Sequence, residues 1–418
     1  MPNPSKPAIA PTRRVLAIVL AGGKGERLHP MTHERSKPAV PFGGKYRIID
    51  FVLSNFVNSG VQSIYVLVQY MSQSLIEYLR SNWRTAGLTG EQFITMVPPQ
   101  MRLGTMWYRG TADAVRQNLN LIHDFDPDIV AVFGADHVYR MDIGQMIRWH
   151  VETGADASVA TIPVPLKQAH SFGIVETDAR GRVTGFLEKP PQAKHMPGNT
   201  THALASMGNY LFNRDVLVEL LKNRYQNETD LDFGKNVLPD IVKTHKLYAY
   251  DFSTNVLPGI KLYEENAYWR DVGTIGSFYQ ANMDILGARP KLNLNNRRWF
   301  IHSGRYDGPP AKILDGKLNN CIIGDGCFVR NATIKNSILG RGVHVHDGAV
   351  IEDSIIMDFC KIRSEAHLKR VIVDRFNEIP TKMRIGFDRE EDAQRYFVDS
   401  GGLVVVPRGE TVPRGNNR

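Results

Sequence analysis

A glycine-rich turn near the start of the chain contains residues that could bind a phosphate group. The turn follows an apolar run that begins at Val15, and its residues are Gly22, Gly23, Lys24 and Gly25. Glycines let backbone N–H groups approach an anion, and cationic side chains can neutralise a polyphosphate. Four basic residues lie in or shortly after the turn: Lys24, Arg27, Arg35 and Lys37. The spacing matches neither a P-loop nor GxGxxG, so a plain strand–helix turn with solvated charges is the alternative.

Three acidic residues and one lysine are candidates for metal and sugar binding. Asp136 follows a buried strand in FGADHVYRMD, where a carboxylate is costly to bury without a partner, and Mg²⁺ is a suitable partner. Asp271, in YWRDVGT, is the candidate second ligand. Glu188 and Lys189, in GFLEKP, could accept sugar hydroxyls and neutralise a sugar phosphate. The alternatives are a helix cap for Asp136, a turn for Asp271 and a surface ion pair for the other two.

The composition indicates a globular protein rather than a nucleic-acid binder. The chain has 418 residues and a net charge of +8, yet it contains no long Lys/Arg block. The basic residues gather near glycine turns, which favours small phosphorylated ligands. Three scattered cysteines, Cys321, Cys327 and Cys360, argue against a disulfide framework and for a reducing compartment. No apolar run reaches membrane-spanning length, so we expect a cytoplasmic protein with no membrane or nucleic-acid partner.

Apolar strands alternate with helical patterns from Val15 to about Leu286. The pattern predicts strands over residues 14–23, 63–70 and 128–140, and helices over 48–60, 72–83 and 111–125. Such alternation indicates βαβ units and an α/β fold with a mostly parallel, Rossmann-like sheet. Ligands bind beyond the carboxyl ends of parallel strands, and the glycine turn and Asp136 both fall at such ends.

A six-residue repeat follows a stretch rich in Pro, Gly and Asn. Leu339, Val345, Ile351 and Met357 stand six positions apart, and small or β-branched residues recur four positions further on. This spacing predicts a β-helix whose lead side chains point inward, and it disfavours an ordinary β-sandwich. We therefore expect a disordered lead-in at 1–12, a catalytic domain at 13–286, a linker at 287–311, and a β-helix with a terminal cap at 312–418.

Longer motifs point to a known family. Eight stretches resemble those of bacterial glucose-1-phosphate adenylyltransferases, which are sugar nucleotidyltransferases: LAGGKGERL, SKPAVPFGGKYRIIDFVLSN, WYRGTADAVRQN, GADHVYRMD, FLEKP, ASMGNYLF, DFGKNVLP and YWRDVGT. The resemblance runs from about Val15 to Arg375. It implies a nucleotidyltransferase sheet followed by a left-handed β-helix of hexapeptide repeats. It also implies that ATP and α-D-glucose 1-phosphate give ADP-glucose and pyrophosphate, with Mg²⁺, for glycogen synthesis.

The resemblance implies roles for individual residues. The triphosphate of ATP would be bound by Gly22, Gly23, Lys24, Gly25, Arg27 and Lys37. The adenine edge would be read by Gln100, and the base would lie against Gly110. Glucose 1-phosphate would be bound by Tyr108, Gly173, Glu188, Lys189 and Ser206. The metal would be held by Asp136 and Asp271, which would form the catalytic set with Arg27 and Lys37.

A few positions depart from the family pattern. Glu26 replaces a small hydroxyl residue in the turn, which affects one local hydrogen bond rather than the class of reaction. Glu34 replaces an activating lysine of the enteric relatives. Arg47 and Arg375 match positions linked to allosteric anions. We expect Arg35, which follows Glu34, to form an anion site with them. We therefore expect a homotetramer regulated by sugar phosphates or other anionic effectors, but not by the enteric effector set.

Three other functions fit parts of the sequence. A uridylyl- or thymidylyltransferase would share the turn and Asp136, but WYRGTADAV argues against it. A non-catalytic regulatory subunit would have the same fold, but it would have lost active-site residues that are present here. A solenoid acyltransferase would have a catalytic histidine in the repeats, whereas the nucleotide motifs lie outside them.

Overall fold

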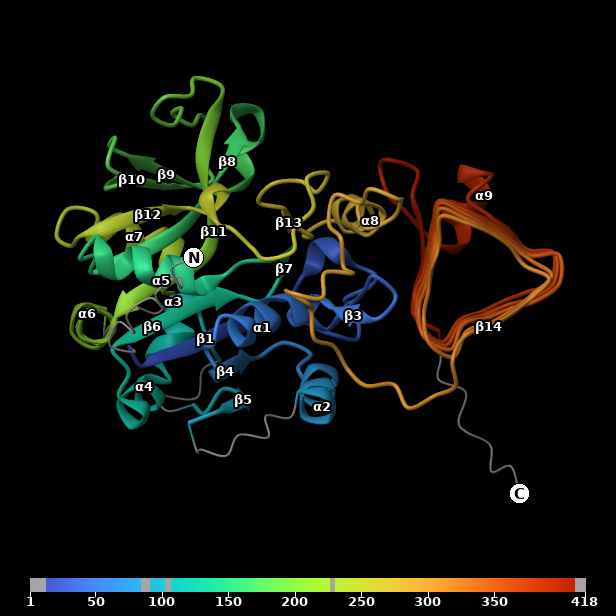
Figure 1. Ribbon diagram of the computed structural model, residues 1–418, viewed down its shortest axis with the longest axis horizontal. Helices are drawn as coiled ribbons and strands as arrows, with labels where there is room; N and C mark the ends of the chain where they lie inside the picture. Colours follow the sequence, from blue (N-terminus) through green and yellow to red (C-terminus); the bar gives the residue numbers. More distant parts are fainter. Residues whose placement is uncertain (1–12, 84–90, 102–106, 226–229, 410–418) are drawn as a thin grey trace, which may run out of the picture.

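The chain folds into an α/β domain and a triangular coil of short strands. The computed structural model describes residues 13–83, 91–101, 107–225 and 230–409. Figure 1 views the coil nearly along its axis, with helix α8 (Ile275–Met283) between it and the α/β sheet. Both parts of the predicted architecture, the α/β sheet and the β-helix, are therefore confirmed.

One nine-stranded sheet forms the centre of the α/β domain. Alternate residues of β1 (Val15–Ala21) face two apolar cores: Leu16 belongs to one core and Ala17 to the other. A strand buried on both faces needs a continuous apolar run, which explains the sequence VLAIVLA. Four neighbouring strands form a parallel block, and they are β6 (Ile129–Gly134), β1 (Val15–Ala21), β4 (Ser63–Val68) and β5 (Phe93–Val97). The other strands are β11 (His202–Asn213), β8 (Ala157–Pro165), β9 (Gly173–Thr177), β10 (Val183–Glu188) and β12 (Leu247–Asp251).

The sheet is flanked by helices, and one predicted helix is divided into two. Asn118 leaves the helical conformation, and its Nδ2 donates to Ala114 O at 2.8 Å and to the Tyr108 hydroxyl at 2.9 Å. Such side-chain bonds compete with the helix, so the prediction of one helix over 111–125 is wrong. The helices in this domain besides α8 are α1 (Ile48–Asn58), α2 (Gln73–Asn82), α3 (Thr111–Arg116), α4 (Leu119–Phe125), α5 (Ile143–Glu152), α6 (Arg214–Glu219) and α7 (Leu238–Ile241).

A second correction concerns the strand predicted over 128–140. It ends at Gly134 and resumes as β7 (His137–Tyr139), which leaves the main sheet. β7 pairs in antiparallel register with β13 (Trp269–Asp271), and His137 lies opposite Asp271. This small two-stranded sheet brings Asp271 to the end of β6.

The coil consists of three sheets, one on each side of the triangle, and their strands are parallel except for an antiparallel pair at the end of the third sheet. The first contains β14 (Lys312–Leu314), β17 (Phe328–Arg330), β20 (His344–Val345), β23 (Lys361–Ile362) and β26 (Glu378–Ile379). The second contains β15 (Lys317–Asn319), β18 (Thr333–Lys335), β21 (Val350–Glu352), β24 (His367–Lys369) and β27 (Arg384–Ile385). The third contains β16 (Ile322–Ile323), β19 (Ile338–Leu339), β22 (Ile355–Ile356), β25 (Val371–Val373), β29 (Val404–Val406) and β28 (Phe397–Val398). Helix α9 (Arg389–Arg395) precedes β28.

The six-residue spacing does not hold on every side of the coil. Leu339, Val345 and Ile351 are buried in the coil interior, as predicted. The next interior residue is Ile356, only five positions further on, whereas Met357 packs in the cluster shared with the α/β domain. The inward orientation predicted for Met357 is therefore wrong, because the third side of a coil is one residue shorter.

Apolar contacts and one buried ion pair join the third sheet to the α/β domain. Ile338, Ile355 and Ile372 belong to the same apolar cluster as Phe278 of α8. The Arg35 guanidinium lies 2.5 Å from the Asp374 carboxylate, and both side chains are almost fully buried. The two domains are thus packed into one body through the third sheet.

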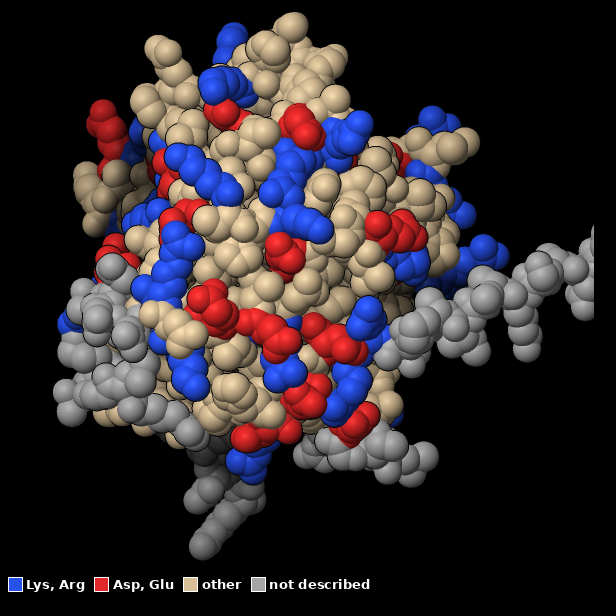
Figure 2. All heavy atoms as spheres, turned by 90° about the vertical axis from the view of Figure 1, so that its left-hand side faces the viewer, with Lys and Arg blue, Asp and Glu red and all other residues tan. Residues whose placement is uncertain are grey.

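Figure 2 shows the face of the α/β domain that points away from the coil. On this face, Lys and Arg are interspersed with Asp and Glu.

Candidate active site

A cavity of about 890 Å³ opens at the carboxyl ends of β1 and β6. Its lining comes from segments far apart in the sequence, including the glycine turn, the residues after β6, and β13. It is lined by fourteen of the fifteen residues for which the resemblance implied a substrate or metal role: Gly22, Gly23, Lys24, Gly25, Arg27, Lys37, Tyr108, Gly110, Asp136, Gly173, Glu188, Lys189, Ser206 and Asp271. Gln100 is not part of this lining; its Nε2 donates to Pro98 O at 2.9 Å in an exposed segment.

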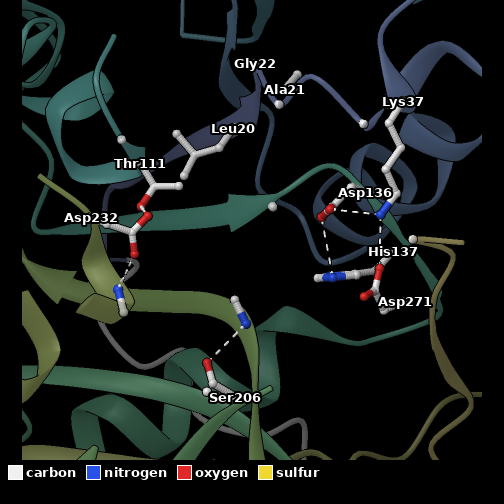
Figure 3. Close-up of a pocket in the computed structure, with 18 of the residues that line it drawn as sticks. Leu20, Ala21, Gly22, Lys37, Thr111, Asp136, His137, Ser206, Asp232 and Asp271 are labelled. Carbon is white, nitrogen blue, oxygen red and sulfur yellow. Dashed lines mark hydrogen bonds and ion pairs between the residues drawn. The ribbon is translucent and has the colours of Figure 1, made fainter. Parts of the chain in front are cut away.

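Lys37 lies between two carboxylates at one end of the cavity. Its Nζ donates to Asp136 Oδ2 and to Asp271 Oδ1, each at 3.0 Å (Figure 3). Lys37 begins a short 3-10 helix, Lys37–Ala39, that packs against α1, and its side chain is only 7% exposed. The ammonium group is consequently fixed at the point where the two predicted metal ligands meet.

The charges of these three groups stabilise one another. Burial alone would lower the pKa of Lys37, but the charges of Asp136 and Asp271 outweigh this effect and raise it. Burial would raise the pKa of Asp136, but His137 and Lys37 hold it well below its usual range. The lysine is therefore a cation and Asp136 an anion at neutral pH.

The same end of the cavity has a donor set suited to a divalent cation. One potential ligand atom from each of Asp136, His137 and Asp271 lies within 4.8 Å of the others. The Lys37 ammonium already lies between the two carboxylates, so this position accepts positive charge. Carboxylate oxygens are suitable ligands for Mg²⁺, which usually takes one or two of them together with phosphate oxygens. The residues present therefore fit a divalent metal.

The glycine turn is closely packed against this end of the cavity. Gly25 has φ +67°, and a Cβ atom there would lie 3.0 Å from Lys37 Cβ. Only glycine combines this conformation with so close an approach. A Cβ on Gly273 would lie 3.0 Å from an Arg27 guanidinium nitrogen and 2.9 Å from Asp271 Oδ1. Arg27 and Asp271 thus both lie against Gly273, a proximity that neither motif predicts.

The other end of the cavity carries the Glu188–Lys189 pair. The Lys189 ammonium lies 3.8 Å from Glu188 Oε1, and Lys189 N donates to Phe172 O at 3.0 Å. Lys189 has φ +49°, which is unusual for a residue other than glycine. Burial raises the pKa of Glu188. A Cβ on Gly173 would lie 2.9 Å from Glu188 Oε2, so this glycine leaves the carboxylate accessible.

Several lining residues were not assigned a role from the sequence. Among them are Gln69, Thr111, His137, Asp232 and Trp269. Gln69 follows β4, so its position at the carboxyl end of a parallel strand could have identified it. His137 is adjacent to Asp136. Asp232 opens DFGKNVLP, a motif without an assigned role, and Thr111 and Trp269 lie within motifs of which other residues were selected.

The three arginines expected to bind effectors lie near the interface between the domains. Arg35 is paired with Asp374, and Arg47 donates to Ala39 O at 2.9 Å while lying 4.3 Å from the Tyr78 ring centroid. Arg375 Nε lies 3.4 Å from Asp358 Oδ2. Burial and then the charge of Arg375 lower the pKa of Arg47 to about 10. The three guanidinium groups are therefore close enough to repel one another, although each has a contact within the protein.

Comparisons with known proteins identify the class to which this fold and site belong. The nucleotidyl transferase family matches residues 16–287, and the GlmU-like C-terminal hexapeptide family matches residues 309–406. The protein is thus a nucleotidyltransferase whose hexapeptide region forms a left-handed β-helix, and enzymes of this class generally use a divalent cation. The described residues contain no helix long and apolar enough to cross a membrane.

Curated relatives define the family more narrowly. Glucose-1-phosphate adenylyltransferase of Thermodesulfovibrio yellowstonii is 52% identical over 396 residues, covering 94% of this chain and 96% of that protein. The enzyme of the same name from Anaeromyxobacter sp. is 44% identical and covers 96% of this chain and 99% of that protein. The one from Deinococcus deserti is 45% identical and covers 95% of this chain and 99% of that protein. The chain belongs to the glucose-1-phosphate adenylyltransferase family.

Proposed function

We propose that this enzyme converts ATP and α-D-glucose 1-phosphate into ADP-glucose and pyrophosphate. The main supporting observation is the arrangement of Lys37, Asp136 and Asp271 beside the glycine turn, at one end of a cavity whose other end carries Glu188 and Lys189. One end suits a polyphosphate with its metal, and the other suits a sugar phosphate. The names of the relatives supply the identity of the sugar phosphate and of the transferred group.

The triphosphate of ATP would lie over the glycine turn. Backbone N–H groups of Gly22, Gly23 and Gly25 would donate to it, and Lys24 and Arg27 would neutralise its charge. Lys24 is exposed and only weakly paired with Glu26, at 3.7 Å, so its ammonium is available to a ligand. Gly110 would lie against the base, and Gln100 would read the adenine edge.

Glucose 1-phosphate would occupy the end of the cavity near Glu188. The Glu188 carboxylate would accept sugar hydroxyl groups, and the exposed Lys189 ammonium would neutralise the phosphate. Tyr108, Gly173 and Ser206 would complete the site. The Ser206 hydroxyl lies in the cavity lining and accepts from Gly208 N at 3.2 Å.

Asp136 and Asp271 would hold Mg²⁺, which when bound neutralises charge on the phosphate oxygens. A phosphate oxygen of glucose 1-phosphate would attack the α-phosphorus of ATP, forming one P–O bond while the bond to the bridging oxygen of pyrophosphate breaks. No covalent enzyme intermediate is needed. Lys37 would neutralise the α-phosphate, so catalysis would rest on positioning and charge stabilisation.

Regulation and assembly are further parts of this proposal. Arg35, Arg47 and Arg375 would bind an anionic effector between the domains, and the enzyme would be a homotetramer that supplies glycogen synthesis. Glu34, which lies 3.3 Å from Arg408, would disfavour fructose 1,6-bisphosphate as an activator. If Arg375→Ala leaves the response to every sugar-phosphate effector unchanged, the regulatory assignment is wrong. A monomer mass in light scattering would refute the tetramer.

The function is tested by measuring pyrophosphate release from glucose 1-phosphate with ATP, UTP or dTTP in the presence of Mg²⁺. We expect turnover with ATP to exceed turnover with the other nucleotides by at least about tenfold. Preference for UTP or dTTP would indicate a uridylyl- or thymidylyltransferase instead. Absence of turnover with all three would support a non-catalytic subunit.

A further inference from the structure

The turn before α3 is joined backbone to backbone to the segment around Leu231. Leu231 N donates to Arg109 O at 2.8 Å, and Leu231 O accepts from Ala112 N and Asp113 N, both at 3.0 Å. Gly110 has φ +109°, and a Cβ there would lie 2.3 Å from Leu231 O. Such a contact is impossible for any residue with a side chain, so the two segments form one tightly packed unit.

The Thr111 hydroxyl extends this unit with side-chain bonds. It donates to Asp232 Oδ2 at 2.8 Å and accepts from Phe233 N at 3.0 Å. The other carboxylate oxygen of Asp232 accepts from Gly234 N at 2.9 Å and from Lys235 N at 3.2 Å. Figure 3 shows Thr111 and Asp232 side by side on the cavity wall. Thr111 therefore orients the Asp232 carboxylate, which in turn binds the backbone N–H groups of Gly234 and Lys235.

These contacts continue to both ends of the cavity. On the sugar side, a Cβ on Gly234 would lie 2.9 Å from Glu188 Oε2. On the nucleotide side, Gln69 Oε1 accepts from Tyr108 N at 2.9 Å and Gln69 Nε2 donates to Tyr108 O at 3.2 Å. A Cβ on Gly22 would lie 3.1 Å from Gln69 Cβ. A continuous series of packed groups therefore runs from the glycine turn to Glu188.

We propose that Thr111 is a positioning residue that couples the two substrate sites. A nucleotide bound against Gly110 would order the turn at Thr111, and the hydroxyl would transmit that order through Asp232 and Gly234 to the Glu188 carboxylate. Each ligand then tightens the binding of the other by the same factor, because coupling between two sites is reciprocal. The proposal rests on the proposed function, since it takes the nucleotide and the sugar phosphate as the two ligands.

The test measures binding without turnover. The dissociation constant of glucose 1-phosphate is determined by calorimetry with and without α,β-methylene ATP, an analogue that cannot release pyrophosphate, in the presence of Mg²⁺. The experiment compares the wild type with Thr111→Val, which removes the hydroxyl at nearly constant shape, and with Thr111→Ser, which retains it. Thr244→Val is the matched control, because that hydroxyl bonds His245 outside the cavity lining.

We expect the analogue to tighten glucose 1-phosphate binding at least about fivefold in the wild type, in Thr111→Ser and in Thr244→Val. In Thr111→Val the factor should fall below about twofold, while the affinity for the analogue alone stays within about twofold of wild type. An unchanged coupling factor in Thr111→Val overturns the inference. If this variant does not fold, Thr111→Ala is measured, and failure of both to fold makes the hydroxyl a structural group and also overturns the inference. Failure of the wild type to bind either ligand overturns the proposed function instead.

Discussion

The ammonium nitrogen of Lys37 lies 3.0 Å from the Asp271 carboxylate, although the two residues are 234 positions apart in the chain. Asp136 binds the same ammonium group from the other side. The Lys37 side chain is nearly buried, so its ammonium group depends on these two carboxylates as charge partners. Asp271 still pairs with the ammonium group when Asp136 loses its charge, so substitution of Asp136 should affect chemistry more than folding.

Asp136→Asn should lower turnover by roughly 1000-fold, which corresponds to about 4 kcal/mol of lost stabilisation of the transition state. The amide keeps the shape of the side chain but loses the charge that would hold the metal. Pyrophosphate release measures the effect, and circular dichroism checks the fold. Asp215→Asn, on the surface of α6, is the control and should be fully active. Turnover of Asp136→Asn within about tenfold of wild type would refute the metal role.

Lys189→Ala should raise the KM for glucose 1-phosphate roughly 10- to 100-fold and change the KM for ATP much less. The expected size follows from the loss of one charge-assisted hydrogen bond, about 1.5–3 kcal/mol. Lys194→Ala is a suitable control because its ammonium pairs with Glu176 outside the cavity lining. Equal changes in the two KM values would mean that Lys189 does not contact the sugar phosphate.

Asp50→Asn should destabilise the fold by about 1–3 kcal/mol at pH 7.5. The buried carboxylate accepts from the Tyr78 hydroxyl, from Trp83 Nε1 and from Arg47 N. An amide has only one acceptor oxygen, so at least one of these buried donors loses its partner. Urea unfolding measures the change, with Asp126→Asn as the exposed control. A loss no larger than that of the control would contradict the network.

The stability of the wild type should decrease as pH falls below about 6.5, partly because of His150. Burial lowers the pKa of His150, so the folded state binds fewer protons than the unfolded state below the ordinary histidine pKa of about 6.5. Asn213 Nδ2 donates to Ala155 O, so its Oδ1 accepts from His150 Nε2, and Nδ1 is left for the Ser158 hydroxyl. His150→Gln should be less stable than wild type at pH 8, and the difference should shrink towards pH 5. A difference independent of pH would refute this assignment.

Local patterns predicted most of the fold, but they could not give contacts between distant segments. The apolar run of β1 and the glycine turn indicated a strand with a ligand site at its end because that relationship lies within ten residues. The proximity of Lys37 and Asp271 depends on the pairing of β7 with β13, which no periodicity encodes. Met357 follows the six-residue pattern and still faces outward. The third side of the coil is one residue shorter, so Ile356 points inward and Met357 packs against the α/β domain. Thr111 and Asp232 were overlooked because their hydroxyl–carboxylate bond joins two separate motifs.

The column formed by Ile338, Ile355 and Ile372 repeats every 17 residues, since these residues are paired in register on successive strands of the third sheet. Each is followed by a residue that faces the coil interior: Leu339, Ile356 and Val373. A gain or loss of one whole turn of the coil would return every later side chain to its own face. A single-residue insertion within these strands would exchange the two columns and separate the domains. The corners between strands can absorb extra residues, because α9 and β28 lie between β25 and β29, which are nevertheless paired directly. Evolution and protein engineering can therefore insert segments at the corners, but they can extend the strand register only by complete turns.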